Sequence, residues 1–316
     1  MLFKPVARII HSNKDSKVTD LWDIKGAKLK TVSIRHTSDL KEDIEKLQRQ
    51  GLLNKHLAEA YLQFNYDVTA ALPGARCLLI IAMPQPLTRA VFNWQGKVYR
   101  CDIPPTYIVK ADDARIKDAL IAIVGPDGFK VTRVHLPVKT LAVRSGLAQY
   151  GRNNITYVPG YGSYHRLAAF ATDCECQEDN WGEPKMMKAC EGCFRCGENC
   201  PTGCIPKDRF LLHAENCLTR HNEREDILES WIKPDWHNAL ISCMRCQLVC
   251  PVNKNQFTNI VAGPVFSETE TALLLQKTPL NTLPNDTRLK LSEIAMDDSR
   301  EVLARNLDLL IKNQTL

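Results

Sequence analysis

The sequence Cys190-Glu-Gly-Cys193-Phe-Arg-Cys196-Gly-Glu-Asn-Cys200-Pro201 determines how the rest of the chain is interpreted. Gaps of two residues let a turning backbone aim three thiolates at one iron–sulfur cubane. The longer gap before Cys200 and the proline after it carry the chain away, so the fourth cysteine of such a run ligates a second cluster. The spacing therefore predicts two clusters rather than one.

A second cysteine run follows at Cys243-Met-Arg-Cys246-Gln-Leu-Val-Cys250-Pro251. It keeps the last two spacings of the first run, which are also those of bacterial two-cluster ferredoxins. Leu240 stands where its first cysteine would be, so one ligand is missing. Cys217, which lies between the two runs, can supply that ligand.

The cysteines of the two runs, with Cys217, make two sites of four thiolates. We expect one 4Fe–4S cluster on Cys190, Cys193, Cys196 and Cys250, and the other on Cys200, Cys217, Cys243 and Cys246. A pair of zinc sites is the alternative, because four thiolates also suit zinc. Zinc does not need the third closely spaced cysteine, the three-residue gap or the proline, so the pattern favours iron–sulfur clusters. Disulfides are less consistent with dense thiols in a chain without a signal peptide.

The composition is ordinary for a globular protein, with 44% hydrophobic and 24% charged residues in a chain of 316. A net charge of +5 permits contact with nucleic acid or an acidic redox partner and requires neither. We find no signal peptide and no apolar run that could span a bilayer, so we expect a cytoplasmic protein without membrane contact. Five cysteines lie outside the expected clusters: Cys77, Cys101, Cys174, Cys176 and Cys204. We expect them to be small buried hydrophobes or inert thiols. The Cys174 and Cys176 pair would be reactive if exposed.

Hydrophobic periodicity predicts helices and strands in alternation before the cysteine runs and helices after them. The expected strands are 27–34, 76–83, 129–136 and 167–172, with a hairpin over 91–99 that turns at Gln95-Gly96. The expected helices are 39–64 with a break at Gly51, 112–124, 139–150, 223–231, 235–241, 268–276, 285–294 and 300–312. Residues 152–165 form a polar, glycine-rich and aromatic stretch, which is either a surface loop or a ligand-binding loop.

The order of motifs around these runs resembles that of the epoxyqueuosine reductases. The motifs are Ala142-Val-Arg-Ser-Gly146-Leu, Gly151-Arg-Asn-Asn154, Tyr161-Gly-Ser163 and Thr172-Asp173, followed by the two cysteine runs. Many ferredoxins share the cysteine runs alone, whereas the whole order is far more specific. The similarity spans residues 70 to 260, approximately, which is most of the chain.

This resemblance implies an α+β fold and an enzyme that uses cobalamin and two 4Fe–4S clusters, related to the reductive dehalogenases. Residues 1–180 would form a nitroreductase-like α/β core that binds the corrinoid and the substrate. Residues 181–260 would form a ferredoxin-like two-cluster domain, and 261–316 a helical C-terminal segment packed on the core. The corrinoid would be base-off, in line with the absence of an Asp-x-His-x-x-Gly motif. By motif position, the residues that would contact it are Asn154, Tyr161, Gly162, Ser163 and Thr219.

The chain departs from these reductases at the strand that carries their aspartate proton donor. The corresponding stretch, 131–137, contains no aspartate, and His135 stands nearest to that place. A histidine can deliver a proton near neutral pH, although a structural histidine at a strand end is an equal alternative. The chain also lacks the C-terminal helical repeats that help those enzymes hold tRNA. Both departures point to another, unknown substrate.

The leading hypothesis is therefore a reductase. A flavodoxin or ferredoxin would donate electrons, which would pass through the two clusters to the corrinoid and then to a small-molecule substrate. One alternative is an electron-transfer or corrinoid-activating protein with no substrate of its own. Another is an epoxyqueuosine reductase that acts on tRNA, although no basic cluster with interleaved aromatic residues stands out in the sequence.

Overall fold

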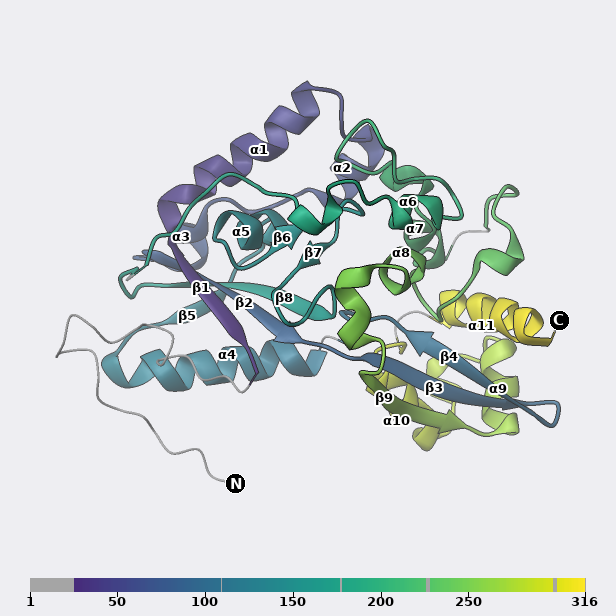
Figure 1. Ribbon diagram of the computed structural model, residues 1–316. Coiled ribbons are helices and arrows are strands. Elements are labelled where there is room, and N and C mark those ends of the chain that lie inside the picture. The colour runs from purple at the N-terminus through teal and green to yellow at the C-terminus, as the bar shows by residue number, and fades with distance from the viewer. Residues whose placement is uncertain (1–25, 109, 177, 226–227, 298–299, 316) are drawn as a thin grey trace. The chain divides into compact units, whose positions relative to one another are not determined.

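The structure is a computed structural model that describes residues 26–316 except 109, 177, 226–227, 298–299 and 316 (Figure 1). Its packing divides the chain into two compact units. The first comprises Met1–Pro84, Ala111–Tyr150 and Arg166–Met186, and the second comprises Gln85–Lys110, Gly151–His165 and Met187–Leu316. Each unit draws on separate stretches of the chain. The linear division expected at residues 180 and 260 concerns functional domains, and it stays a prediction.

The first unit is built around a four-stranded sheet in the order β1-β2-β8-β5, in which β1 is antiparallel to β2 and β5 to β8. Its strands are β1 (Lys28–Ser33), β2 (Cys77–Pro84), β5 (Val131–Arg133) and β8 (His165–Thr172). The helices of this unit are α1 (Thr37–Arg49), α2 (Lys55–Tyr61), α3 (Val68–Ala71), α4 (Lys110–Val124) and α5 (Val138–Arg144).

Strand β2 is buried on both faces, as its continuous apolar run predicted. Leu79 and Ile81 pack on one face against Ile116 and Leu120 of α4, which lies along the sheet in Figure 1. Leu78 and its alternate neighbours therefore point to the other side, where α5 contacts the strand. Ala168 and Phe170 of β8 belong to the same cluster, so two helices and the two central strands make the core of this unit.

Arg144, at the end of α5, joins three separate segments of the first unit. Its guanidinium donates two hydrogen bonds, of 2.6 and 2.7 Å, to the carboxylate of Asp43 in α1. It also lies over the Trp181 ring, 5.4 Å from the centroid, and that ring stacks on His36. The Arg144 of the reductase-like motif therefore has a structural role here. The helix expected over 139–150 ends at this residue.

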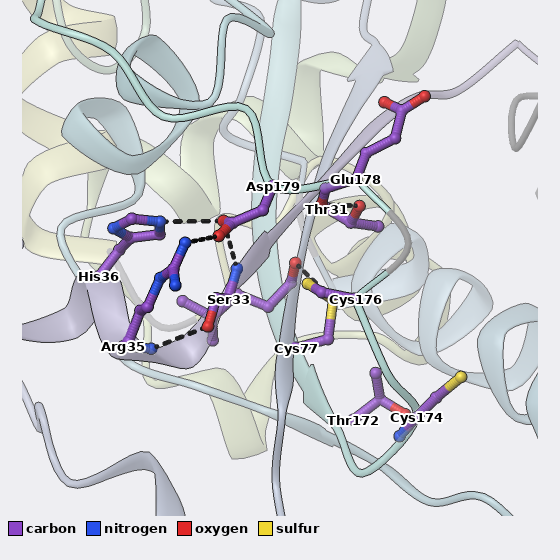
Figure 2. Close-up of a disulfide and its surroundings, with 11 residues drawn as sticks. Thr31, Ser33, Arg35, His36, Cys77, Thr172, Cys174, Cys176, Glu178 and Asp179 are labelled. Atoms are coloured by element: carbon purple, nitrogen blue, oxygen red, sulfur yellow. Dashed lines mark hydrogen bonds and ion pairs between the residues drawn. A yellow bond between two sulfur atoms is a disulfide. The ribbon is translucent and has the colours of Figure 1, made fainter.

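A disulfide joins Cys77, at the start of β2, to Cys176 in the segment that follows β8 (Figure 2). The expectation that both would be unpaired thiols is wrong, because folding brings their Cα atoms to 5.0 Å across a sequence separation of 99. Asp179 anchors the same segment a few residues later. Its carboxylate accepts hydrogen bonds of 2.9 Å from the Ser33 backbone and from the His36 ring. Cys174 remains a free thiol.

The second unit contains a three-stranded sheet in the order β4-β3-β9. Strands β3 (Leu87–Trp94) and β4 (Lys97–Ile103) form the expected hairpin, and Gln95 and Gly96 at its turn both have positive φ. Strand β9 (Ile260–Phe266) runs parallel to β3, in a stretch that was not expected to be a strand. Phe92 and Phe266 stack at 4.7 Å between ring centroids in the core beneath this sheet.

Three helices complete that core and confirm the predicted helical C-terminus. They are α9 (Glu268–Leu275), α10 (Asn285–Glu293) and α11 (Arg300–Thr315). Buried Leu274, Leu291 and Leu307 come one from each of them. The cysteine runs fold instead into short pieces, α6 (Arg195–Glu198), α7 (Leu218–Asn222) and α8 (Arg245–Leu248). The helix expected over 223–231 is not found among its described residues, and that expected over 235–241 is reduced to a 3-10 turn.

The remaining elements are short strands and 3-10 turns. The strands are β6 (Gln149–Tyr150) and β7 (Thr156–Tyr157). The 3-10 turns are η2 (Ile34–His36), η3 (Gly125–Asp127), η4 (Lys188–Cys190), η5 (Ala214–Asn216), η6 (Pro234–Trp236), η7 (Pro251–Gln256) and η8 (Leu280–Thr282). Across the described part of the chain, none of the helices has the length and apolar character needed to cross a membrane. The predicted α+β class is confirmed, and the nitroreductase-like topology stays a prediction.

We expect Cys176→Ser to destabilise the protein, because a cross-link over a long loop restricts the unfolded chain. In the chain-entropy model a closed loop of about 100 residues contributes about 4–5 kcal/mol. Thermal unfolding of the iron-loaded chain would measure the loss as a lower Tm. Cys174→Ser is the matched control, since it removes a free thiol two residues away. Equal Tm values for the two variants, with no Cys77–Cys176 linked peptide in a non-reducing digest, would refute the disulfide.

Candidate iron-sulfur centre

The structure brings the expected cysteines together in two groups, both within the second unit. Burial, followed by negative charge on Cys190, Cys250 and Cys193, raises the pKa of Cys196 to about 11. Burial, followed by negative charge on Cys243 and Cys217, raises the pKa of Cys246 well above its usual value. Cys200 and Cys217 act in the same way on Cys243. These proximities reproduce the two groups of four that the spacing predicted, and the assignment of each cysteine as a ligand stays a prediction.

The two cysteine runs have the same local fold, which explains their shared spacing. In the first run the backbone N–H of Asn199 bonds to Arg195 and that of Cys200 to Gly197. In the second run Val249 bonds to Arg245 and Cys250 to Gln247 in the same way. Each run therefore makes one turn of helix and then ends at its fourth position with a proline after it. The helices of the two runs, α6 and α8, also contact each other.

Cys204 lies beside the second group, although sequence analysis assigned it no role. Its side chain is buried, and its sulfur is 3.5 Å from that of Cys200 and also hydrogen-bonds with Cys217. Its position four residues after Cys200, in Cys200-Pro-Thr-Gly-Cys204, was the only signal in the sequence. Among the residues that the structure describes, no group of three or more His, Cys, Asp or Glu side chains has the geometry to hold a single metal ion.

The loop from Gly151 to Tyr157 donates hydrogen bonds to sulfur atoms of both groups. The backbone N–H of Arg152 donates to Cys190, and the Tyr157 hydroxyl donates to Cys250. The Asn153 amide donates to Cys246 in the other group, and to the Tyr157 oxygen at 3.1 Å. The sequence left this stretch open between a surface loop and a ligand-binding loop, and neither interpretation included these contacts.

Gly151 makes this arrangement possible because it leaves space for the two donors. A Cβ at this position would lie 2.5 Å from the Asn153 Oδ1 atom and 2.5 Å from the Tyr157 ring. Any other residue would therefore push the amide or the phenol away from the thiols. The glycine of the Gly151-Arg-Asn-Asn154 motif thus has a steric explanation within the protein.

The motif Tyr161-Gly-Ser163 is bonded to the second cysteine run. The Ser163 hydroxyl donates to Gln247 at 2.8 Å and accepts from Asn253 at 2.8 Å, and the Ser163 N–H donates to the Asn253 oxygen. Gly162 has φ +58°, and a Cβ there would lie 2.3 Å from the same oxygen. These contacts explain Gly162 and Ser163 without a corrinoid, and Tyr161 beside them is partly exposed.

The other residues predicted to contact the corrinoid lie apart along the chain. The Thr219 hydroxyl is 3.1 Å from that of Ser242 and also bonds to the Cys217 sulfur. Asn154 has φ +60° and is partly exposed. Asn154, Tyr161 and Thr219 are the partly exposed members of the five predicted contacts, so an external ligand can reach them. The fit to a corrinoid is partial, and the corrinoid contacts stay a prediction.

His135, the predicted proton donor, belongs to the first unit. It follows β5 rather than lying within a strand, and its side chain is exposed. Its carbonyl accepts a hydrogen bond from the Asn65 backbone, and its ring is 5.3 Å from that of Phe64. These contacts position the imidazole at the surface of its own unit, and its role in proton transfer stays a prediction.

The residues of the two groups and their surroundings fit iron–sulfur clusters. Eight thiols gather in two groups, and backbone, amide and phenol donors point at their sulfur atoms. Arg152 adds a positive side chain close to Cys190, and its buried Nε has no hydrogen-bond partner among the described residues. Donors and a cation around clustered thiolates are what a negatively charged cluster needs.

Comparison with known proteins agrees with this chemistry. Residues 189–253 match the family model described as a 4Fe-4S double cluster binding domain. An epoxyqueuosine reductase of Listeria monocytogenes is 29% identical over 114 residues, which are 36% of this chain and 29% of that protein. A tetrachloroethene reductive dehalogenase of Desulfitobacterium hafniense is 29% identical over 124 residues, 38% of this chain and 22% of that protein. The chain thus matches less than a third of the length of either relative.

Solved structures extend the likeness in fold to most of the chain. The epoxyqueuosine reductase of Streptococcus thermophilus superposes with a TM-score of 0.64 and 17% identity, covering 91% of this chain and 77% of the other. An epoxyqueuosine reductase with an epoxyqueuosine-modified tRNA-Tyr stem loop superposes with a TM-score of 0.60 and 20% identity, covering 90% and 77%.

The paired thiol groups and the match of residues 189–253 indicate a double 4Fe–4S cluster binding domain within this chain. The chain is similar, in sequence and in fold, to the epoxyqueuosine reductases, and it shares sequence with the reductive dehalogenases. The resemblance expected from the order of motifs is therefore confirmed.

We expect Cys250→Ala to remove one cluster and spare the other, because Cys250 belongs to the group of Cys190, Cys193 and Cys196. Iron per chain after anaerobic reconstitution should fall from about eight to about four, as two cubanes become one. Cys101→Ala is the control, since Cys101 is buried in β4 and lies in neither group. Uptake of zinc in place of iron, or retention of about eight irons by Cys250→Ala, would contradict the assignment.

His165, just after the Tyr161-Gly-Ser163 motif, should make the protein less stable in mild acid. Burial lowers the pKa of this ring to about 4, and both nitrogens are already used, with the Gly162 carbonyl at 3.0 Å and the Thr156 hydroxyl at 3.1 Å. The unfolded chain therefore binds more protons between pH 6.5 and 4, and stability falls as the pH drops below 6.5.

Between pH 7.5 and 5.5 this residue should cost about 1 kcal/mol of unfolding free energy. His165→Gln should remove that part of the pH dependence, and His135→Gln, at an exposed site, should leave it in place. The comparison uses chemical unfolding of the cluster-loaded chain at both pH values, with iron content checked. Parallel pH profiles for wild type and His165→Gln would show that the buried ring is not responsible.

Proposed function

We propose that this chain is an oxidoreductase that passes electrons through two 4Fe–4S clusters and reduces epoxyqueuosine in tRNA. The observation that carries the proposal is the likeness in fold to epoxyqueuosine reductases over 91% of the chain, combined with two groups of four thiols. A shared fold alone would not define an activity. The thiol groups supply the electron path that such an activity needs.

The relatives favour this substrate over the unknown one that the sequence suggested. The absence of an aspartate from 131–137 was one reason for expecting a different substrate. Against it stands the fold match to an epoxyqueuosine reductase with a modified tRNA stem loop, at a TM-score of 0.60. The net charge of +5 is compatible with an RNA partner.

The roles of the chain's own residues follow from their chemistry. Each 4Fe–4S cluster carries one electron at a time, and reduction of an epoxide takes two electrons and two protons, so two clusters in one unit suit the reaction. A flavodoxin or ferredoxin is the proposed electron donor. His135 is the proposed proton donor, since its imidazole is exposed and a histidine side chain can act as a general acid.

Cobalamin is the further cofactor of this proposal. It would supply a low-potential metal centre, and the partly exposed Asn154 and Tyr161 are two residues proposed to contact it. Its support is the resemblance of motifs alone, because the internal hydrogen bonds of Ser163 and Thr219 are satisfied without it. It is therefore tested separately from the activity.

The test uses the whole chain, purified without oxygen and reconstituted with iron, sulfide and cobalamin. It is incubated with an epoxyqueuosine-modified tRNA-Tyr stem loop and a chemical reductant, and the nucleosides are measured by mass spectrometry. We expect queuosine to form, to depend on about eight irons per chain, and to be lost in Cys250→Ala. An established epoxyqueuosine reductase on the same stem loop is the positive control.

Each outcome of this assay tests a different part of the proposal. Full iron with no queuosine, while the control enzyme is active, would refute the reductase and leave an electron carrier. Turnover without cobalt would refute the cobalamin part alone. His135→Gln should slow turnover about 100-fold or more if the imidazole delivers the proton, and an unchanged rate would give His135 a structural role.

A further inference from the structure

We propose that Asn153 and Tyr157 are positioning residues that set the reduction potentials of the two clusters through one hydrogen-bonded chain that links them. The proposal rests on the cluster assignment of the proposed function and is independent of the substrate. The chain runs from Cys246 in one group, through the Asn153 amide and the Tyr157 hydroxyl, to Cys250 in the other.

The direction of each hydrogen bond in this chain is determined by its neighbours. The Asn153 oxygen accepts from the Ile155 backbone N–H at 3.4 Å, so its NH2 group faces the phenol and the thiol. The phenol oxygen accepts from Asn153, so its single hydrogen is left for Cys250. Both ends of the chain therefore donate to sulfur, and neither end accepts from it.

Burial makes these donors effective. Asn153 and Tyr157 are each only 3% exposed, so water does not compete for these two donors. A hydrogen bond to an anionic acceptor is stronger than a neutral one, and stronger still in a medium of low dielectric constant. Reduction adds negative charge that spreads onto the sulfur ligands, so a donor stabilises the reduced cluster more and raises its potential.

The two residues differ in which clusters they affect. Tyr157 donates to Cys250, so its effect falls on the cluster of Cys190, Cys193 and Cys196. Asn153 donates directly to Cys246 and also orients the phenol, so its effect falls on both. The loop is thus a shared support, and the order of potentials along the electron path depends on it.

A purely structural role for the loop makes a different prediction. Asn153 and Tyr157 would then lower stability when changed and leave both potentials where they are. Tyr157→Phe discriminates between the two roles, because it removes one O–H group and keeps the packing of the ring. Asn153→Leu keeps a similar shape and removes the amide donors.

The experiment is a redox titration monitored by electron paramagnetic resonance, on the whole chain loaded with about eight irons and without cobalamin or tRNA. The signals are assigned with Cys250→Ala, which lacks one cluster. In Tyr157→Phe we expect the reduced-to-oxidised ratio of the Cys250 cluster to fall about tenfold at a fixed solution potential. This corresponds to a reduction potential lower by about 59 mV for one electron. The other cluster should stay unchanged. In Asn153→Leu both ratios should fall.

Tyr99→Phe is the matched control, since Tyr99 is a buried tyrosine on β4, outside the loop, and should shift neither potential. Should Asn153→Leu lose iron, Tyr157→Phe carries the test with a second measurement, the terminal Fe–S stretch in resonance Raman spectra, which loss of the donor should shift. Unchanged potentials and an unchanged stretch in Tyr157→Phe would overturn the proposal. A chain that takes up no iron would instead refute the cluster assignment beneath it.

Discussion

The burial of two groups of thiols in one unit is the constraint on which the rest of the second unit depends. Burial is the largest contribution that raises the pKa of Cys246, Cys243 and Cys196, because a thiolate is costly to remove from water. The protein offsets this cost with nearby hydrogen-bond donors. Backbone N–H groups of Gly197, Arg245 and Thr219 each donate to a neighbouring cysteine. The Asn238 amide, 3.3 Å from the Cys243 sulfur, adds a side-chain donor.

The cysteine runs do not form a unit by themselves. They contain mostly short helices and turns, which bury little apolar surface of their own. Their support comes from elsewhere in the second unit: Ser163 holds Gln247 and Asn253, and strand β9 continues the chain into a sheet with β3. A double-cluster domain that matches only residues 189–253 is therefore embedded in a larger packed unit.

Features determined by local chemistry could be predicted from the sequence. The grouping of cysteines follows from ligand spacing, β2 from its continuous apolar run, and the hairpin from Gln95-Gly96. Features that depend on distant partners could not. Strand β9 contains Gly263 and Pro264, which are signals against a strand, yet it pairs with β3. Gly263 is needed there because a Cβ would lie 3.0 Å from Thr88 Cγ2 and 3.2 Å from the Arg89 carbonyl oxygen. The Cys77–Cys176 pair, 99 residues apart, has no local signal at all.

The loop after Gly151 shows how close a sequence-based site prediction can come and still miss the contact. Asn154 was selected by motif position, but its backbone adopts φ +60°, and it is the preceding residue, Asn153, that is buried against the thiols. Polar side chains in a glycine-rich loop indicate that something is bound there, and they do not indicate which partner. Here the nearest partners are the protein's own sulfur atoms, and Gly151 is required by the donors rather than by an external ligand. The same motif can therefore mark a support for the clusters in this chain, whether or not a corrinoid also lies against its partly exposed side.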